Sequence, residues 1–320
     1  MGALLGTKRL AVQTIDAAHR QCKAKWWWEP NSKIAIIESA AAIGLAMLPP
    51  GRFHPFDLDT FGLGKLLEAA ARKGATTCLI GIGGSATNDG GFGLAHALGW
   101  QFVDDRGRLI ERWIELTNLR RIIAPQKRDW FKELFVAVDV QNPLLGKYGA
   151  TRIYGPQKGI QANEFEAAEI CLRRLTSVYK AGIGHDFAIA PGAGAAGGLG
   201  FGLAAFANGK LLPGFDLFAE QSNLDRRLRR ADLVITGEGC VDHSTLMGKG
   251  VGQIAKKCKK LKIPCIAVAG KTHTARLLRK NFNQVHALLD TTTKRDATTN
   301  AVDCLQYMVQ RIALKISNSH

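Results

Sequence analysis

Two patterns of apolar residues alternate along the chain. Runs of four to seven mostly apolar residues are typical of buried strands, and apolar residues recurring every three to four positions are typical of helices. The first pattern predicts strands at 34–37, 76–82, 135–138, 233–236 and 264–269. The second predicts helices at 39–48, 60–72, 92–98, 164–179, 203–208 and 251–260. Residues 1–32 give no clear periodicity. The alternation of strands and helices predicts an α/β fold built on parallel sheets.

The length of 320 residues favours two domains over one. The order of strand, glycine-rich loop and helix is strongest in 57–100 and 226–320, and we expect these segments to form one Rossmann- or flavodoxin-like domain. Residues 1–56 and 101–225 would then form a second α/β domain. Ligands of such folds bind beyond the carboxyl ends of the strands.

A glycine-rich segment connects the strand at 76–82 to the helix at 92–98, and it carries Gly83, Gly84, Ser85, Asn88 and Asp89. Glycines let the backbone approach a ligand closely, and a helix N-terminus attracts anions. A carboxylate there suits a metal ion that bridges phosphates. A capped turn needs only one such polar side chain. The segment is therefore interpreted as a phosphate or magnesium site.

Three further segments carry polar or glycine residues beyond predicted strands or in tight turns. Asp139 follows the strand at 135–138, Lys158 lies in the turn 155–159, and Gly194 and Gly197 belong to a second glycine-rich loop. Asp139 fits a turn cap as well as a catalytic carboxylate, and Lys158 also fits a solvated turn residue.

The loop at 237–249 adds Glu238, Asp242 and Lys249. Phosphoryl transfer requires amides and a lysine around phosphates, carboxylates for magnesium, and a carboxylate that accepts the proton of the attacking hydroxyl. The chain contains no G-x-x-x-x-G-K-[ST] sequence, which excludes a P-loop kinase. No acidic ribose-binding residue is evident after Gly91, which weakens a dehydrogenase interpretation.

The composition adds a formal net charge of +16, with Lys and Arg concentrated near 226–230, 256–262 and 276–280. These clusters lie in helical patterns without interleaved aromatic residues, so we expect solvated faces and a positive field that suits small anions. Specific nucleic-acid recognition is not indicated. Seven cysteines without CxxC spacing favour free thiols and a cytoplasmic location, and no segment is long enough to span a membrane.

Several motifs in a fixed order give the sequence a family resemblance. Gly81-Ile-Gly-Gly-Ser-Ala-Thr-Asn-Asp-Gly-Gly91 closely resembles the hallmark of the bacterial glycerate kinase family. The resemblance continues in Ile37-Glu-Ser-Ala-Ala-Ala42, Asp139-Val-Gln-Asn-Pro-Leu144, Gly155-Pro-Gln-Lys-Gly159, Pro191-Gly-Ala-Gly-Ala-Ala-Gly-Gly198 and Leu233-Val-Ile-Thr-Gly-Glu-Gly239. It implies a two-domain α/β kinase that transfers the γ-phosphoryl group of ATP, with Mg²⁺, to D-glycerate and forms 2-phosphoglycerate.

The resemblance also implies roles for individual residues. The phosphate and substrate sites would comprise Gly83, Gly84, Ser85, Asn88, Asp89, Gly194, Gly197 and Lys249. Asp139 would be the base or a magnesium-orienting carboxylate, Asp89 a second magnesium ligand, and Lys158, Glu238 and Asp242 would line the catalytic cleft. The expected partners are glycerate and ATP, and no oligomeric state follows from the sequence.

The chain departs from the family pattern in two ways. An opening strand with an Asp-Ser-(Phe/Tyr)-Lys loop and a following Asp-Gly-Gly-Glu-Gly-Thr motif are missing, so the sequence predicts a glycerate kinase homologue shortened at its N-terminus. Cys240 also stands where the family normally has Arg, which removes an anion-binding group. The alternatives are a catalytically impaired or inactive remnant and, less favoured, a basic nucleic-acid-binding protein.

Overall fold

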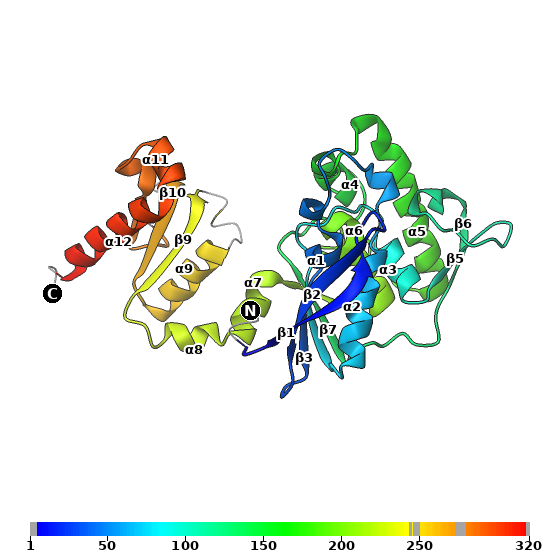
Figure 1. Ribbon diagram of the computed structural model, residues 1–320, viewed down its shortest axis with the longest axis horizontal. Coiled ribbons are helices and arrows are strands. Elements are labelled where there is room, and N and C mark those ends of the chain that lie inside the picture. Colours follow the sequence, from blue (N-terminus) through cyan, green and yellow to red (C-terminus); the bar gives the residue numbers. More distant parts are fainter. Residues whose placement is uncertain (1–4, 243–244, 246–249, 273–279, 318–320) are drawn as a thin grey trace. The chain divides into compact units, whose positions relative to one another are not determined.

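A computed structural model describes residues 5–242, 245, 250–272 and 280–317 of the chain. The chain forms two compact units, Met1–Leu217 and Phe218–His320. Both combine a sheet containing parallel strands with helices (Figure 1), which confirms the predicted α/β class. Within the described residues, no helix is long and apolar enough to cross a bilayer.

A six-stranded sheet in the order β1-β2-β3-β4-β7-β8 forms the centre of the first unit. Its strands are β1 (Lys8–Ile15), β2 (Gln21–Glu29), β3 (Ile34–Glu38), β4 (Thr77–Gly81), β7 (Glu133–Val138) and β8 (Lys210–Pro213). Strands β3, β4, β7 and β8 are parallel, whereas β1, β2 and β3 are joined in antiparallel fashion. The parallel strands therefore bring their carboxyl ends to one edge of the sheet.

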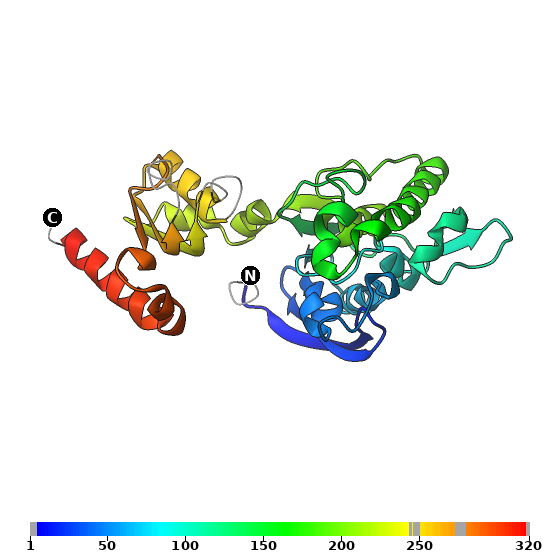
Figure 2. The ribbon, with the colours of Figure 1, turned by 90° about the horizontal axis from the view of Figure 1, so that it is seen from above.

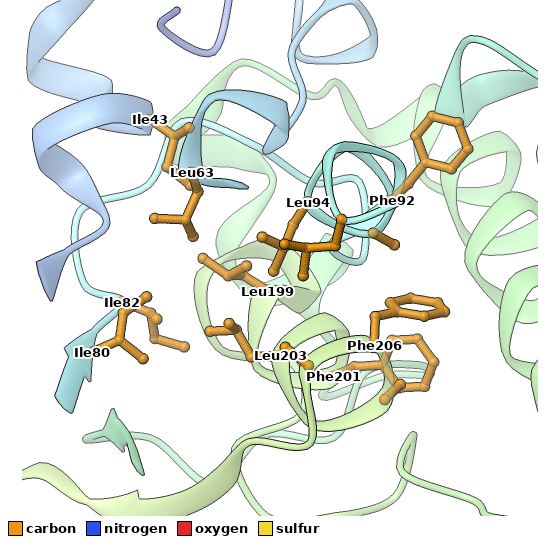
Figure 3. Close-up of a cluster of buried hydrophobic side chains, with 14 of the residues drawn as sticks. Ile43, Leu63, Ile80, Ile82, Phe92, Leu94, Leu199, Phe201, Leu203 and Phe206 are labelled. Carbon is orange, nitrogen blue, oxygen red and sulfur yellow. The ribbon is translucent and has the colours of Figure 1, made fainter. Parts of the chain in front are cut away.

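Side chains alternate between the two faces of this sheet, as the twofold period of a strand requires. Ile37 and Ile80 contribute to the large core on one face, and their neighbours Ile36 and Leu79 contribute to a smaller cluster on the other. The large core is filled by helices that contribute Leu63, Phe92, Leu94, Leu199 and Phe206 among others (Figure 3). Both faces of the central strands are thus apolar, which explains their continuous hydrophobic runs.

The helices and minor strands of the first unit follow the parallel strands or connect them. The α-helices are α1 (Ala40–Ile43), α2 (Phe61–Arg72), α3 (Phe92–Ala97), α4 (Ala150–Tyr154), α5 (Phe165–Ile183) and α6 (Ala195–Ala207). The short 3₁₀ helices are η1 (Leu45–Met47), η2 (Pro55–Asp57), η3 (Trp113–Asn118), η4 (Pro156–Lys158) and η5 (Ala162–Glu164), and β5 (Gln101–Asp104) pairs with β6 (Leu119–Ile123).

The two glycine-rich segments of the sequence pack directly against each other. Gly91 and Gly202 approach so closely that a Cβ atom on Gly91 would lie 2.5 Å from the Cα atom of Gly202. A Cβ atom on Gly197 would lie 1.9 Å from the carbonyl oxygen of Thr87, and the amide of Gly90 donates to the carbonyl oxygen of Gly197 at 3.1 Å. Side chains at these positions would force the two backbones apart.

The second unit contains a parallel sheet in the order β11-β10-β9, formed by β9 (Val234–Val241), β10 (Cys265–Thr272) and β11 (Gln284–Ala287). Its helices are α8 (Leu224–Leu228), α9 (Gly250–Leu261), η7 (Leu288–Asp290), α11 (Lys294–Thr299) and α12 (Ala301–Ser317), and α7 (Gly214–Gln221) spans the boundary between the units. Helices α9 and α12 cover opposite faces of the strands (Figure 1).

Two differences from the sequence-based expectation concern the assignment of 57–100 and the structure of residues 1–32. Residues 57–100 belong to the first unit, because β4 pairs with β3 and β7, and they do not share a sheet with 226–320. Residues 1–32, which gave no periodicity, contain the β1–β2 hairpin, seen in blue in both views (Figures 1 and 2). Trp26 and Trp28 enter the large core, whereas Trp27 packs in the cluster on the opposite face.

The close contact between Gly91 and Gly202 leads to a stability prediction. We expect Gly202→Ala to lower the free energy of unfolding of the first unit by about 1–3 kcal/mol, because backbone atoms of Gly91 occupy the space that the methyl group needs. Urea denaturation followed by tryptophan fluorescence measures this unit alone, since all six tryptophans precede residue 218.

Gly182→Ala in α5 is the matched control, because a Cβ atom at this position would have no described neighbour within 4 Å. That change is expected to be neutral or to stabilise by about 0.5–1 kcal/mol through helix propensity. Equal midpoints for the two variants would contradict the proposed packing constraint.

Candidate active site

A pocket of about 340 Å³ opens at the carboxyl edge of the first unit's sheet. The loop after β4 contributes Gly83, Gly84 and Ser85 to it, the end of β7 contributes Asp139, and the turn of η4 contributes Lys158. Ala195 and Ala196 at the start of α6 form another wall. The structure therefore brings five of the sequence-predicted site residues into one pocket, as expected for ligands bound beyond parallel strands.

Lys158 is the buried cation of this pocket, with 8% of its surface exposed. Its Nζ atom donates to Ser85 Oγ at 3.1 Å and to the carbonyl oxygen of Thr87 at 2.6 Å. Burial lowers the pKa of Lys158 to about 7, although the charge of Asp89 acts in the opposite direction. An anion entering the pocket would favour the protonated amine, so the site is suited to bind negatively charged groups.

Asp139 follows the last residue of β7 and is exposed, in contrast to Lys158. A Cβ atom on Gly214 would lie only 2.6 Å from Asp139 Oδ1, so the glycine at that position leaves room for the carboxylate. A solvent-accessible carboxylate that lines a pocket can accept a proton from a bound hydroxyl group or hold a magnesium ion.

A series of side-chain hydrogen bonds that the sequence did not reveal supports the pocket wall near Asp139 and Lys158. Tyr154 lines the pocket, and its hydroxyl donates to Asn142 Oδ1 at 2.7 Å. Asn142 Nδ2 in turn donates to the carbonyl oxygen of Tyr148 at 2.8 Å. The only signal in the sequence that Tyr154 lines the pocket is its position four residues before Lys158. The chain of hydrogen bonds fixes the segment that carries Lys158.

Asn88 lies completely buried behind the pocket lining, where its Nδ2 donates to Thr151 Oγ1 at 2.9 Å. Within the described part of the chain, Asn88 Oδ1, Thr87 Oγ1 and Ser39 Oγ are buried without a hydrogen-bond partner. Unpaired buried oxygens are rare, because each costs about 1–3 kcal/mol. These atoms, in the segments that follow β3 and β4, are suited to accept a hydrogen bond from water or from a ligand.

Asp89, the expected magnesium ligand, does not line this pocket. Its carboxylate is fully buried and Oδ2 accepts from the Thr60 amide at 2.9 Å, the Thr60 hydroxyl at 2.7 Å and the Gly93 amide at 2.9 Å. Burial, and then the charge of Asp59, raise the pKa of Asp89 to about 6. Asp89 therefore caps α3 and the segment leading into α2, and its oxygen atoms are already engaged.

The two glycines expected at the phosphate, Gly194 and Gly197, also do not line the pocket. The amide of Gly194 donates to the carbonyl oxygen of Asn142 at 2.9 Å, and a Cβ atom on Gly194 would lie 2.1 Å from the carbonyl oxygen of Pro143. Gly197 packs against Thr87. Both glycines allow close backbone packing, and the amide of Gly194 is already engaged.

The remaining predicted residues belong to the second unit. Glu238 lies on β9 and Asp242 directly follows that strand. Thr245 connects them, because its hydroxyl donates to Glu238 Oε1 and accepts from the Asp242 amide at 3.0 Å. The thiol of Cys240 donates to Asp242 Oδ2 at 3.7 Å. Lys249 lies outside the described residues.

No cluster of three or more His, Cys, Asp or Glu side chains suited to a metal ion occurs among the residues that the structure describes. In this described part, Asp139 is the only carboxylate that lines the pocket of the first unit. The carboxylate oxygens of Asp139 are suitable ligands for magnesium, which enzymes often bind through one or two carboxylates together with substrate phosphates.

The burial of Lys158 predicts a pH-dependent stability. The folded-state pKa is near 7 and the unfolded value is 10.5, so the unfolded chain binds more protons between these values and stability rises with pH. We expect the stability of the wild type relative to Lys158→Met to increase by on the order of 1–2 kcal/mol between about pH 7 and about pH 9. Urea denaturation at both pH values measures the difference, and a constant difference would refute a depressed pKa.

The family model for the glycerate kinase family matches residues 1–317. The chain is 40% identical over 278 residues to a glycerate 2-kinase of Escherichia coli, covering 84% of this chain and 71% of that protein. It is also 40% identical over 251 residues to a glycerate kinase of Halalkalibacterium halodurans, covering 78% and 66%.

The structure resembles the crystal structure of a putative glycerate kinase 2 from Salmonella typhimurium LT2, with a TM-score of 0.85 and 32% sequence identity. That alignment covers 100% of this chain and 85% of the other. The chain thus spans about two thirds of the length of several curated relatives it matches, such as 66% of the Halalkalibacterium protein. The full-length family match and these similarities show that the chain belongs to the glycerate kinase family.

Proposed function

We propose that this chain transfers the γ-phosphoryl group of ATP to a hydroxyl group of D-glycerate and forms 2-phosphoglycerate. The proposal is supported by family membership and, above all, by one observation of geometry. The pocket of the first unit combines a buried lysine with an exposed carboxylate at the carboxyl edge of a parallel sheet. A kinase for a small hydroxy acid needs both groups, one for the acid and one for the reacting hydroxyl.

We assign the pocket to glycerate and not to ATP. A general base must lie within hydrogen-bond reach of the hydroxyl group from which it takes a proton. Asp139 is the carboxylate available in this pocket, so the acceptor hydroxyl lies beside it. Lys158 then binds the carboxylate of the same small molecule, and Ser85 holds the amine in place. Binding through a fixed, buried cation orients the hydroxyl for transfer.

Magnesium, when bound with ATP, would neutralise charge on the transferred phosphoryl group. Asp139 is the residue of the first unit that fits such an ion. Glu238 and Asp242 are the corresponding candidates in the second unit, where the hydroxyl of Thr245 fixes the orientation of the Glu238 carboxylate.

The first functional prediction concerns Asp139. Asp139→Asn should reduce glycerate-dependent ADP release by at least about 100-fold, because a positioned general base contributes on the order of 10²–10⁴-fold to a rate. A coupled assay with purified protein, D-glycerate and Mg-ATP measures the rate. Enolase added without a phosphoglycerate mutase identifies 2-phosphoglycerate as the product.

Asp105→Asn is the matched control, because Asp105 is an exposed aspartate that does not line the pocket. It should retain wild-type turnover. Wild-type turnover in Asp139→Asn would remove Asp139 from the mechanism, and no ADP release from the wild-type chain would overturn the proposed activity.

A second prediction tests which substrate occupies the pocket. Lys158→Met should raise the KM for glycerate by about 10-fold or more and leave the KM for ATP nearly unchanged, because hydrogen bonds to charged groups contribute about 1.5–3 kcal/mol. In the wild type, the KM for glycerate should also rise above about pH 7, where the amine loses its proton. Initial rates at varied glycerate and fixed ATP, and the reverse, separate the two constants. A selective increase in the KM for ATP would reassign the pocket to the nucleotide.

A further inference from the structure

The second unit carries most of the net positive charge of the chain. Residues 218–320 contain 18 of the 43 Lys and Arg residues but only 8 of the 27 Asp and Glu residues, a net charge of +10 out of +16. Small anionic substrates need a few cations at one site, so the proposed kinase reaction leaves most of this charge without a role. Its distribution over the surface is therefore informative.

Three lysines surround a groove of about 390 Å³ in this unit. Lys259 and Lys262 lie at the end of α9, and Lys280 lies on the segment that enters β11. Asn281 and Asn283 also line the groove, and its described lining contains no acidic residue. Lys259 Nζ donates to the carbonyl oxygen of Lys280 at 2.9 Å, which joins the two sides. The groove therefore presents cations and amide groups together.

The groove lies at the edge of the sheet opposite to the candidate catalytic residues. Pro264 and Asn283, which line it, directly precede β10 and β11. Glu238 and Asp242 lie toward the carboxyl end of β9, and the three strands are parallel. A ligand in the groove would consequently be separate from chemistry at the carboxyl edge.

Arginines of α8 extend the basic surface beside α9. Lys257 forms an ion pair with Asp225 of α8 at 2.7 Å. This hydrogen bond and the nearby charges of Lys257, Arg229 and Lys260 lower the pKa of Asp225. The ion pair itself joins α8 to the basic face of α9. Most of the cationic side chains of these helices are exposed. The surface is thus larger than the groove, as an extended ligand would require.

Lys262 has an unusual backbone conformation. Its φ angle is +58°, in the left-handed region that usually favours glycine at the end of a helix. The helix dipole explains lysines in the last turn of α9. It does not explain a lysine in place of glycine at a strained position, and such positions often have a functional reason.

We propose that the groove and the adjoining faces of α8 and α9 bind the phosphodiester backbone of nucleic acid without sequence specificity. Several exposed cations on one surface can contact successive phosphates of that backbone. The exposed large apolar side chains of the described part of this unit lie on β9, η7 and α12, and not on α8 or α9. A membrane-binding surface would combine its cations with such apolar groups, so nucleic acid fits this surface better than lipid.

The test uses the full chain and a fluorescently labelled DNA duplex of about 20 base pairs, followed by anisotropy from about 50 to about 200 mM NaCl. Wild-type affinity should fall steeply with salt. The triple variant Lys259→Glu, Lys262→Glu and Lys280→Glu should bind at least about 10-fold more weakly, and the slope of log K against log salt should decrease by about 3, since each lost phosphate contact contributes about 0.9.

The matched control carries Lys23→Glu, Lys25→Glu and Lys73→Glu, which change three exposed lysines of the first unit and give the same net charge. It should keep most of the wild-type affinity. Equal weakening in both triple variants, or no binding by the wild type, would overturn the proposal, and so would stronger binding to anionic phospholipid vesicles than to the duplex.

Lys262→Gly provides a test that does not depend on introduced negative charge. Glycine relieves the left-handed backbone, so the variant should be at least as stable as the wild type and yet bind the duplex more weakly. Unchanged duplex binding in this variant would contradict a role for Lys262. Retained glycerate-dependent ADP release in all variants would show that the groove acts independently of the kinase site.

Discussion

Direct packing of one glycine-rich backbone on another is the constraint on which the first unit depends. The segment after β4 and the start of α6 approach each other at Gly91 and Gly202 and again at Thr87 and Gly197. Both segments also line the pocket, through Ser85 on one side and Ala196 on the other. The distance between these walls is therefore set by backbone contact and not by flexible side chains. Glycine is required here mainly for proximity of the two chains.

This rigid frame makes the burial of Lys158 possible. An amine removed from water needs fixed acceptors, and Ser85 Oγ and the carbonyl oxygen of Thr87 supply them from the packed segment. The two acceptors offset only part of the free-energy cost of burying the charged amine, so the pKa of Lys158 is lowered. An anionic substrate would offset that cost on binding. The pocket is thus preorganised for a negative group before the substrate arrives.

The sequence predicts the central elements because β3, β4, β7 and β10 are compact apolar runs between helices. It misses the β1–β2 hairpin because three consecutive tryptophans remove the polar alternation that marks a strand: Trp27 faces one apolar cluster while Trp26 and Trp28 face the other. The site is predicted in part. Gly83, Ser85, Asp139 and Lys158 line the pocket as expected.

Three of the other expected site residues, Asp89, Gly194 and Gly197, do not line the pocket, for a physical reason. A glycine motif does not reveal whether its backbone faces a ligand or another backbone, and Gly194 and Gly197 face other backbone segments. A motif likewise does not reveal whether its carboxylate is buried, as that of Asp89 is. The neighbours that decide these cases lie far away in sequence: Lys158 meets Ser85 across 73 residues and Asn88 meets Thr151 across 63.

The hydrogen bonds of Asp89 have a consequence for how the first unit folds. One carboxylate oxygen serves the amide and hydroxyl of Thr60, which precedes α2, and the amide of Gly93 in α3. Thr60 Oγ1 also accepts from the amide of Leu94 at 2.8 Å. The bonds of Thr60 with Asp89 and with Leu94 form only after the chain has closed a loop of about thirty residues between the two helices. Helix formation and loop closure thus become one cooperative event, and we infer that α2, α3 and the segment after β4 unfold together as a single unit.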